Sequence, residues 1–418
     1  MAFWLSVALW AMCWGGMFTG IYNIVNLGSS DPFTFFQGIR MFFPILALYA
    51  SLIWILKERR TFPFARDPIG FFFLYSLIGF ISSIFLTPAA SQGATPFQGT
   101  YWVSVYLSPL FVIWAILGES RVKERLQAVI YLNYGVFFFL TFALFPTAVR
   151  IFRGQAAFSA FYDLPFGFGQ VTKNGTARYA MIVIIVAGMR FLAERRRRRH
   201  FWLGALVPGL FLLMQTQSRT GLLGLVVICA LYVFLQGLDW RYLLAIPVVG
   251  FIVFVSGFQM RAEGRFDMLL DLSGRGSTWG RALEEIGKSP FLGWGFDADR
   301  ILLNKEQMHN SYLHAMIQTG VLGALCFFLA FASLWFVILK SGLLRTVRRH
   351  RGADRTILME SILIMGFLTS RGFFESTAAF FGVDQLLVIP AMAYIAIAAS
   401  EPVEEESLPE AAGRLETA

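Results

Sequence analysis

The sequence consists largely of apolar runs of about 20 residues, the length at which an α-helix crosses the hydrocarbon core of a bilayer. Charged residues or Gly and Pro separate the runs, and this pattern predicts about twelve membrane-spanning helices. The expected spans are residues 3–25, 33–56, 68–88, 98–118, 126–149, 176–193, 201–217, 220–237, 241–258, 311–339, 356–374 and 378–399. Only 15% of the residues are charged, against about a quarter in soluble domains, so a soluble enzyme, a disordered chain and a disulfide scaffold are excluded.

Short basic connections between the spans predict the orientation of the chain. These connections are residues 57–67, 119–125, 194–200 and 340–355. Basic loops stay in the cytoplasm, so both termini are expected there as well. The segments expected outside are 26–32, 88–97, 150–175 and 259–308. The arginine run 195–199 is then a topology signal, and no nucleic-acid partner is expected, because no aromatic interleaving accompanies it.

The chain divides into four predicted regions. Residues 1–258 hold spans 1 to 9, including the outer loop 150–175, and residues 259–308 form a large outer loop. Residues 309–400 hold spans 10 to 12, and the acidic segment 401–418 is expected to be a disordered cytoplasmic tail. The first run lacks the charged start and the cleavage site of a signal peptide, so it is interpreted as a span.

The outer loop 259–308 carries basic residues against the orientation rule, so they need another explanation. Trp279, Ala282, Leu283 and Ile286 follow helical spacing, and loops of this length are usually functional or disordered. We expect a helical loop folded over the membrane surface. The second large outer loop, 150–175, adds basic and aromatic residues, and the two loops together are predicted to roof a basic cavity.

Three features are predicted to meet at the outer face. Arg219 lies between two spans with almost no intervening loop, and the alternative for it is a snorkelling surface arginine. Arg275 follows Gly-rich sequence at the start of the loop helix, a position that favours anion binding; a plain surface charge is its alternative. His309 lies where the chain re-enters the membrane, and Asn310 or Ser311 is suited to cap the next helix.

Two further arginines require partners. Arg40 lies inside the second span, where a charge is costly, and an anionic lipid headgroup is one candidate partner. Arg371 lies where the eleventh span ends at the outer face. It is predicted either to bind substrate or to pair with Glu375.

These residue types favour transfer of a group from a phosphate-activated donor. A histidine titrates near neutrality and can take a proton from a hydroxyl, whereas arginine binds phosphate bidentately and keeps its charge. Arginines also stabilise the charge that builds on a diphosphate leaving group, which removes the need for a metal. The sequence shows no metal-ligand spacing, and its Asp and Glu residues in the outer loop are interpreted as hydrated or ion-paired, so no metal or other cofactor is expected.

The motifs around these residues resemble the superfamily of O-antigen ligases and Wzy-like O-antigen and exopolysaccharide polymerases. In chain order they are Lys173-Asn174-Gly175, Ser218-Arg219-Thr220-Gly221, Gly274-Arg275 with Trp279, Ser289-Pro290-Phe291-Leu292-Gly293-Trp294-Gly295, His309-Asn310-Ser311-Tyr312-Leu313 and Gly320-Val321-Leu322-Gly323. Each motif alone is weak, and the resemblance rests on their order and on the side of the membrane predicted for them. It covers about residues 170 to 325, and the rest only by topology.

The resemblance implies a bacterial inner-membrane glycosyltransferase with an all-α, GT-C-like fold and a periplasmic active site. The implied donor is a glycan on undecaprenyl diphosphate, transferred with inversion to a sugar hydroxyl of a glycan or of lipid A-core. His309 would activate that hydroxyl, while Arg219 and Arg275 would hold the diphosphate. The other residues predicted to bind substrate are Arg371, Asn174, Asn310 and Arg40. The lipid bilayer and a chain-length regulator are the remaining expected partners.

Two alternatives stay open at this point. The form Gly274-Arg275-x-x-x-Trp279 and the short stretch between Arg275 and His309 resemble the polymerases more than a ligase, which transfers a finished polysaccharide and tends to have a longer loop there. A transporter of anionic lipids or lipid-linked glycans would also have about twelve spans and intramembrane arginines. Against a transporter, the sequence shows no internal hydropathy repeat and no matched pair of broken spans.

Overall fold

The computed structural model describes residues 2–17, 28–61, 68–85, 96–154, 161–163, 170–194, 197–239, 241, 275–304, 306, 308–349, 353–379 and 382–400. Among these residues, 7 helices are long and apolar enough to cross a membrane, and two shorter apolar helices accompany them. The predicted all-α, polytopic membrane fold is therefore confirmed, while the number of twelve spans is not. The division into four regions stays a prediction, and the tail 401–418 and residues 242–258 of the ninth predicted span lie outside the described residues.

Each predicted span that falls within the described residues coincides with helix. The helices are α1 (Ala2–Gly15), α2 (Pro32–Ile39), η2 (Arg40–Phe42), α3 (Phe43–Lys57), α4 (Pro68–Phe85), α6 (Pro96–Leu117), α7 (Val122–Phe152), α8 (Lys173–Ala193), α9 (Arg197–Thr216), α10 (Arg219–Gln236), α12 (Arg275–Lys288), α13 (Ala298–Leu302), α14 (Ser311–Lys340), α15 (Leu343–Arg349), α16 (Ala353–Gly372) and α17 (Val383–Ser400). A short antiparallel hairpin, β1 (Phe161–Asp163) with β2 (Gln170–Thr172), lies in the segment 150–175, which is predicted to lie outside.

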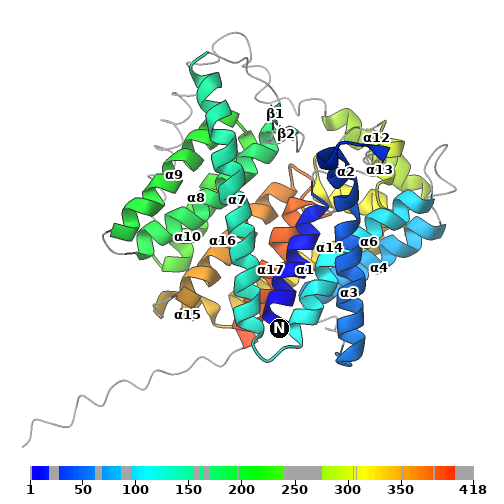
Figure 1. The fold of residues 1–418 in the computed structure, drawn as a ribbon, viewed down its shortest axis with the longest axis horizontal. Coiled ribbons are helices and arrows are strands. Elements are labelled where there is room, and N and C mark those ends of the chain that lie inside the picture. Colours follow the sequence, from blue (N-terminus) through cyan, green and yellow to red (C-terminus); the bar gives the residue numbers. More distant parts are fainter. Residues whose placement is uncertain are drawn as a thin grey trace, which may run out of the picture.

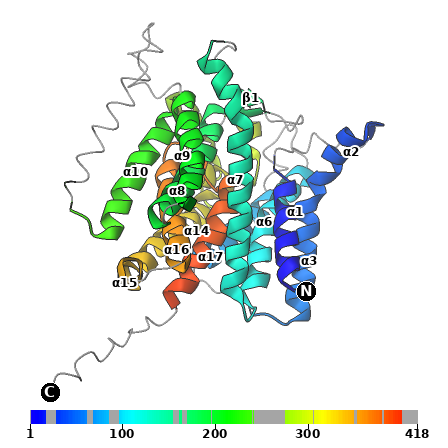
Figure 2. The same ribbon diagram turned by 60° about the vertical axis from the view of Figure 1, so that its left-hand side comes forward.

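The helices form a bundle whose two ends differ (Figure 1). The hairpin and the helices α12 and α13 lie at one end, and α15 lies at the opposite end together with the start of α1 and the end of α17. In the turned view, α15 and the ends of α1 and α17 again lie at the same end of the bundle (Figure 2). This arrangement agrees with the predicted placement of both termini on one side. That this side faces the cytoplasm stays a prediction.

Helix α17 lies at the centre of the bundle, because its described side chains are buried from Val383 to Ile395. Polar side chains fix its position against neighbouring helices. The indole nitrogens of Trp10 and Trp14 both donate to Oδ1 of Asn133 at 2.8 Å, and Nδ2 of Asn133 donates to the carbonyl of Leu386 at 2.8 Å. Helices α1, α7 and α17 are thus joined by one amide, which accepts from two indoles and donates to a carbonyl. Buried polar groups require such partners.

The second predicted span is not one continuous helix. It consists of α2 and α3, with the 3₁₀ turn η2 between them. Asp31 caps α2 by accepting from the backbone N–H of Thr34 at 2.8 Å, and Pro44 stands in the first turn of α3. Arg40 begins η2 and is buried. The break therefore falls at the one charged residue that the sequence places inside this span.

Helix α14 is broken at Gly320, whose φ of 63° lies in the left-handed region. The segment 289–295 fills the break with its own backbone. Val321 N–H donates to the carbonyl of Pro290 at 2.7 Å, and Trp294 N–H donates to the carbonyl of Ile317 at 2.9 Å. A Cβ on Gly293 (φ 66°) would lie 2.5 Å from backbone atoms of residues 318–320. Glycine is thus required on both sides of this contact, which joins two of the sequence motifs.

The predicted helix in the outer loop is confirmed as α12. Ala282 and Ile286 are buried in a cluster with Leu303, Met308 and Ile317, so α12 packs onto the first half of α14. The indole nitrogen of Trp279 donates to the carbonyl of Met308 at 2.8 Å. Leu283, expected on the apolar face, is instead 55% exposed. The packing of α12 holds the residue before His309 against the bundle.

Candidate functional site

The carboxylate of Glu375, in the connection between α16 and α17, lies at the centre of a group of polar side chains. Its Oε2 lies 2.9 Å from Nδ1 of His309. Its Oε1 accepts a hydrogen bond from Nδ2 of Asn174 at 2.6 Å and lies 3.4 Å from Nη2 of Arg275. Three residues that the sequence analysis selected separately therefore contact one carboxylate, which is itself buried.

Local caps place these side chains. Thr172 caps α8 by accepting from the N–H of Gly175, which sets Asn174 in the first turn of α8. Ser218 caps α10 in the same way and donates from its Oγ to Oδ1 of Asn174 at 2.9 Å. The Asn174 amide therefore links the N-terminus of α10 to Glu375. Helix N-termini carry free N–H groups and partial positive charge, which favour an anion nearby.

Asn310 is the N-cap of α14, one of the two capping residues, Asn310 and Ser311, that the sequence offered. Its Oδ1 accepts from the N–H groups of Tyr312 and Leu313 at 3.0 Å. Its Nδ2 donates to the carbonyl of Phe373 at 3.1 Å, and Ser311 Oγ donates to the carbonyl of Glu375 at 2.8 Å. The cap therefore also holds the 373–377 connection in place.

His309 has a φ of 49°, in the left-handed region that residues with a Cβ seldom adopt. His309 lies between Met308, which α12 holds, and Asn310, which caps α14. Its conformation brings the imidazole to Glu375. The side chain of His309 is 29% exposed, so the ring lies at the edge of solvent. Local strain at such a position is typical of functional residues.

Arg275 is the first residue of α12 and reaches back to the connection that holds Glu375. Its Nη1 donates to the carbonyl of Phe374 at 2.9 Å, and its side chain is 21% exposed. A guanidinium has five N–H donors, so a phosphate near this edge can be bound as well. Arg275 is therefore tied to the connection that carries Glu375, and its binding of phosphate stays a prediction.

Positive neighbours set the charge of Glu375. Burial raises the pKa of this carboxyl, but the hydrogen bond with His309 and the positive charges of Arg371 and Arg275 more than offset that effect. The net pKa lies below the ordinary range of a glutamate. Glu375 is therefore an anion at neutral pH, suited to hold an imidazole and to stabilise its protonated form.

Arg371 has a different partner from the one expected. Its Nη1 donates to Oδ2 of Asp384 at 2.8 Å and to Oγ1 of Thr377 at 3.1 Å. Arg178 lies 2.9 Å from the same Asp384 oxygen. The alternative that Arg371 pairs directly with Glu375 is therefore not what the structure shows, and Arg371 acts on Glu375 through its charge alone.

A second polar group lies beside the first. Oδ2 of the buried Asp299, in α13, lies 3.2 Å from Nε2 of His314, and that nitrogen lies 2.7 Å from Nε2 of Gln318. Tyr75 donates to Oε1 of Gln318 at 3.0 Å. Burial raises the pKa of Asp299, but the charge and hydrogen bond of His314 bring the net pKa below its ordinary value.

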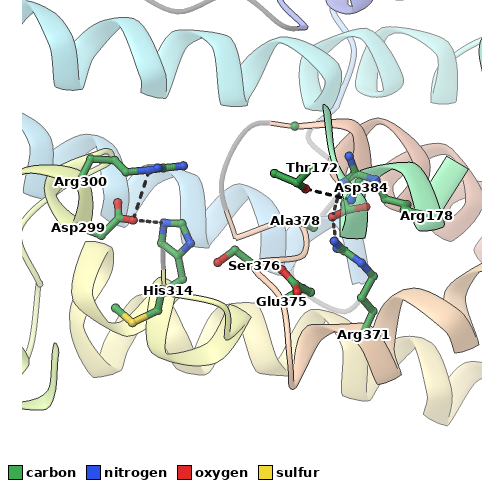
Figure 3. A pocket seen from close by; sticks show the side chains of 13 residues that line it. Thr172, Arg178, Asp299, Arg300, His314, Arg371, Glu375, Ser376, Ala378 and Asp384 are labelled. Atoms are coloured by element: carbon green, nitrogen blue, oxygen red, sulfur yellow. Dashed lines mark hydrogen bonds and ion pairs between the residues drawn. The ribbon is translucent and has the colours of Figure 1, made fainter. Parts of the chain in front are cut away.

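Between the two groups lies a cavity of about 250 Å³ (Figure 3). Asp299, Arg300 and His314 stand on one side of it, and Arg178, Arg371 and Asp384 on the other, while Glu375 and Ser376 lie between them. The cavity is thus bordered by the carboxylate that contacts His309.

Two further residues predicted to bind substrate, Arg219 and Arg40, lie at the starts of helical elements. Arg219 begins α10 directly after Ser218 and is exposed, one residue from the hydrogen bond to Asn174. Arg40 is buried in η2, at the junction of α2 and α3. The prediction that Arg40 binds substrate stays untested by this geometry.

Several residues of this region were not predicted from the sequence. Glu375 was considered only as a partner of Arg371, and Asp299 only as a hydrated or ion-paired loop residue. Arg178 and Asp384 were not considered, although ionisable residues inside apolar spans are a general sign of function. That signal was present in the sequence. The pairing of Asp299 with His314 had no signal, because the two residues belong to different elements.

Comparison with known families identifies part of the chain. Residues 204–328 match the family model described as O-antigen ligase, the Wzy_C domain. This segment includes Arg219, Arg275, His309 and the interlocked Gly293 and Gly320, so the resemblance drawn from the motifs is confirmed there. No curated protein matches the chain. The match and the apolar helices support an integral membrane protein that transfers glycans in the manner of O-antigen ligases and polymerases, with lipid-linked glycans as substrates.

Proposed function

We propose that this protein polymerises a polysaccharide at the periplasmic face of the bacterial inner membrane, using a glycan on undecaprenyl diphosphate as donor. The observation that carries the proposal is the contact of His309 and Arg275 with one buried carboxylate, Glu375. A base and a phosphate-binding cation are thereby held at one site. Transfer from a diphosphate-activated donor needs this combination.

His309 is the general base in this proposal. With Nδ1 directed at Glu375, Nε2 is the nitrogen available to an acceptor hydroxyl. His309 takes the hydroxyl proton as the oxygen forms a bond to the anomeric carbon of the donor sugar. The bond from that carbon to the diphosphate oxygen breaks, and attack from the opposite face inverts the anomeric configuration. Glu375 stabilises the imidazolium, as the carboxylate does in other base–carboxylate pairs.

The arginines stabilise the leaving group. Arg275 lies at the same carboxylate as His309, and the exposed Arg219 begins α10, where the free N–H groups of a helix N-terminus also favour an anion. Negative charge grows on the diphosphate as the glycosidic bond breaks, so fixed cations lower the barrier without a metal. Asn174 and Asn310 hold the surrounding backbone and Glu375, and are positioning residues.

The experiment that tests the proposal offers the purified protein a lipid-diphosphate-linked repeat with and without lipid A-core. A ladder formed from the donor alone identifies a polymerase. Transfer only when lipid A-core is present identifies a ligase, which the short stretch between Arg275 and His309 disfavours. No glycan transfer in either arm, with the donor moved across proteoliposomes, overturns the proposal in favour of a transporter. A chain-length regulator, if it acts on this protein, alters the ladder's length distribution and not its formation.

A further inference from the structure

We propose that the cavity between the Asp299 and Asp384 groups binds a single neutral sugar ring of the glycan substrate. The inference rests on the proposed function and specifies where that function recognises carbohydrate. The cavity measures about 250 Å³ and has Glu375 in its wall, so its occupant lies next to the carboxylate that holds His309 (Figure 3).

The charge of the lining favours a neutral occupant over a phosphate. Arg178, Arg300 and Arg371 are matched by the carboxylates Asp299, Glu375 and Asp384. Both Arg178 and Arg371 already pair with Asp384, and Arg300 lies 4.0 Å from Asp299. An anion in this cavity would meet carboxylates on both sides, which repel it. The diphosphate therefore belongs with Arg275 and Arg219, outside this cavity.

The lining suits hydroxyl groups instead. Each sugar hydroxyl donates one hydrogen bond and accepts others, so it needs carboxylate oxygens and guanidinium N–H groups within one small space. The wall supplies both kinds of atom: Asp299, Glu375 and Asp384 have acceptor oxygens, and Arg178, Arg300 and Arg371 have N–H donors.

The size of the cavity points to one ring. A volume of 250 Å³ corresponds to about eight water molecules at roughly 30 Å³ each. That is room for a monosaccharide with some hydration, and too little for an oligosaccharide, which must extend outward. The site therefore recognises one residue of the glycan, and its shape contributes to sugar specificity.

Direct binding tests the inference without any transfer reaction. Detergent-purified protein is mixed with methyl glycosides of glucose, galactose, mannose and N-acetylglucosamine, and binding is followed by saturation-transfer NMR. Ser376→Phe fills the cavity and leaves every ion pair around it in place, so it is expected to abolish the signal of the glycoside that binds. Ser104→Phe, on α6 and away from the cavity, is the matched control and keeps the signal. No signal from any glycoside with the unmodified protein, or an unchanged signal in Ser376→Phe, overturns the proposal.

A second variant covers the case in which Ser376→Phe fails to fold. The side chain of Arg300 is 40% exposed, so Arg300→Gln is tolerated by the fold but removes a charged donor from the wall. We expect its glycoside affinity to fall about tenfold, the loss of one charged hydrogen bond. Unchanged affinity in Arg300→Gln overturns the proposal as well.

Transfer assays then identify the source of the sugar. If the ring is the acceptor's, Ser376→Phe raises the KM for acceptor and leaves donor-lipid binding unchanged; if it is the donor's, donor affinity falls. Either result supports the inference, and unchanged values for both substrates oppose it. Glycoside binding by a protein that transfers no glycan would instead refute the proposed function and leave the sugar site standing, so the two failures are distinguishable.

Discussion

His309 and Glu375 are 66 residues apart in the chain, yet Nδ1 of the imidazole lies 2.9 Å from Oε2 of the carboxylate. The two residues come from the start of α14 and from the α16–α17 connection, and Ser311 and Asn310 fasten that connection to α14. The imidazole and the carboxylate are therefore fixed by the same backbone contacts. A contact of this kind orients the imidazole.

Replacement of the base tests its role most directly. His309→Ala is expected to lower the rate of glycan transfer by about 10²- to 10⁴-fold, the usual contribution of a positioned general base. Binding of the donor lipid should be nearly unchanged, because the arginines remain. The measurement is single-turnover transfer together with donor binding in detergent. Full activity in folded, inserted protein would remove His309 from the mechanism.

Glu375→Gln keeps the size of the side chain and loses its charge. We expect transfer to fall by roughly 10- to 10³-fold, because the imidazolium loses its stabilising carboxylate. A merely structural role would change stability alone. The discriminating readout is therefore the single-turnover transfer rate of folded, inserted protein, which should fall in Glu375→Gln and stay unchanged in the control Glu306→Gln, which alters only the Thr278 and Arg281 contacts.

Stability should also depend on the charge of Glu375. Its pKa is depressed in the folded protein, so the stabilisation it provides is complete above the ordinary glutamate value of about 4.3 and is lost as pH falls through the lower folded value. The thermal midpoint of the unmodified protein is therefore expected to fall on acidification in this range. Glu375→Gln should flatten that fall. If the thermal midpoints of the two proteins fell in parallel with pH, they would contradict the depressed pKa of Glu375.

The geometry of Arg275 predicts that charge alone is insufficient at this position. Arg275→Lys keeps the positive charge but loses the planar fork that contacts both Phe374 and Glu375. The rate of transfer should drop by at least about tenfold, the effect expected from the loss of one hydrogen bond to a charged group. Arg281→Lys on the same helix is the control, because Arg281 is exposed and pairs with Glu306 at the surface. Equal activity of the two variants would show that Arg275 is only a surface charge.

The break in α14 should be sensitive to a single methyl group. Gly293→Ala places a Cβ 2.5 Å from the backbone of residues 318–320 at a positive φ. The backbone conformation alone costs about 1–2 kcal/mol, and the overlap adds to it. Thermal unfolding in detergent should show a clearly lowered midpoint. Gly287→Ala is the control, since a Cβ there meets nothing within 4 Å and alanine favours the helix α12.

The sequence by itself determined the class of fold, the helix positions and the order of the motifs. Apolar runs of bilayer length leave few alternatives to helix, so the predicted spans coincide with helices wherever the structure describes them. Spacing also predicted α12, and local chemistry predicted that Asn310 or Ser311 caps α14. These features depend on residues close together in the chain, and periodicity or capping preference is sufficient to locate them.

The tertiary structure decided which of these residues meet. Glu375 became the centre of the site because three separate elements direct Asn174, Arg275 and His309 toward it, and no local pattern records that convergence. The partner of Arg371 was decided in the same way. Packing brings Oδ2 of Asp384, on the next helix, to 2.8 Å from Nη1 of Arg371, so Arg371 pairs with Asp384 and not with Glu375. Charges in a low-dielectric interior pair by proximity across helices, so their partners follow from packing and not from sequence order.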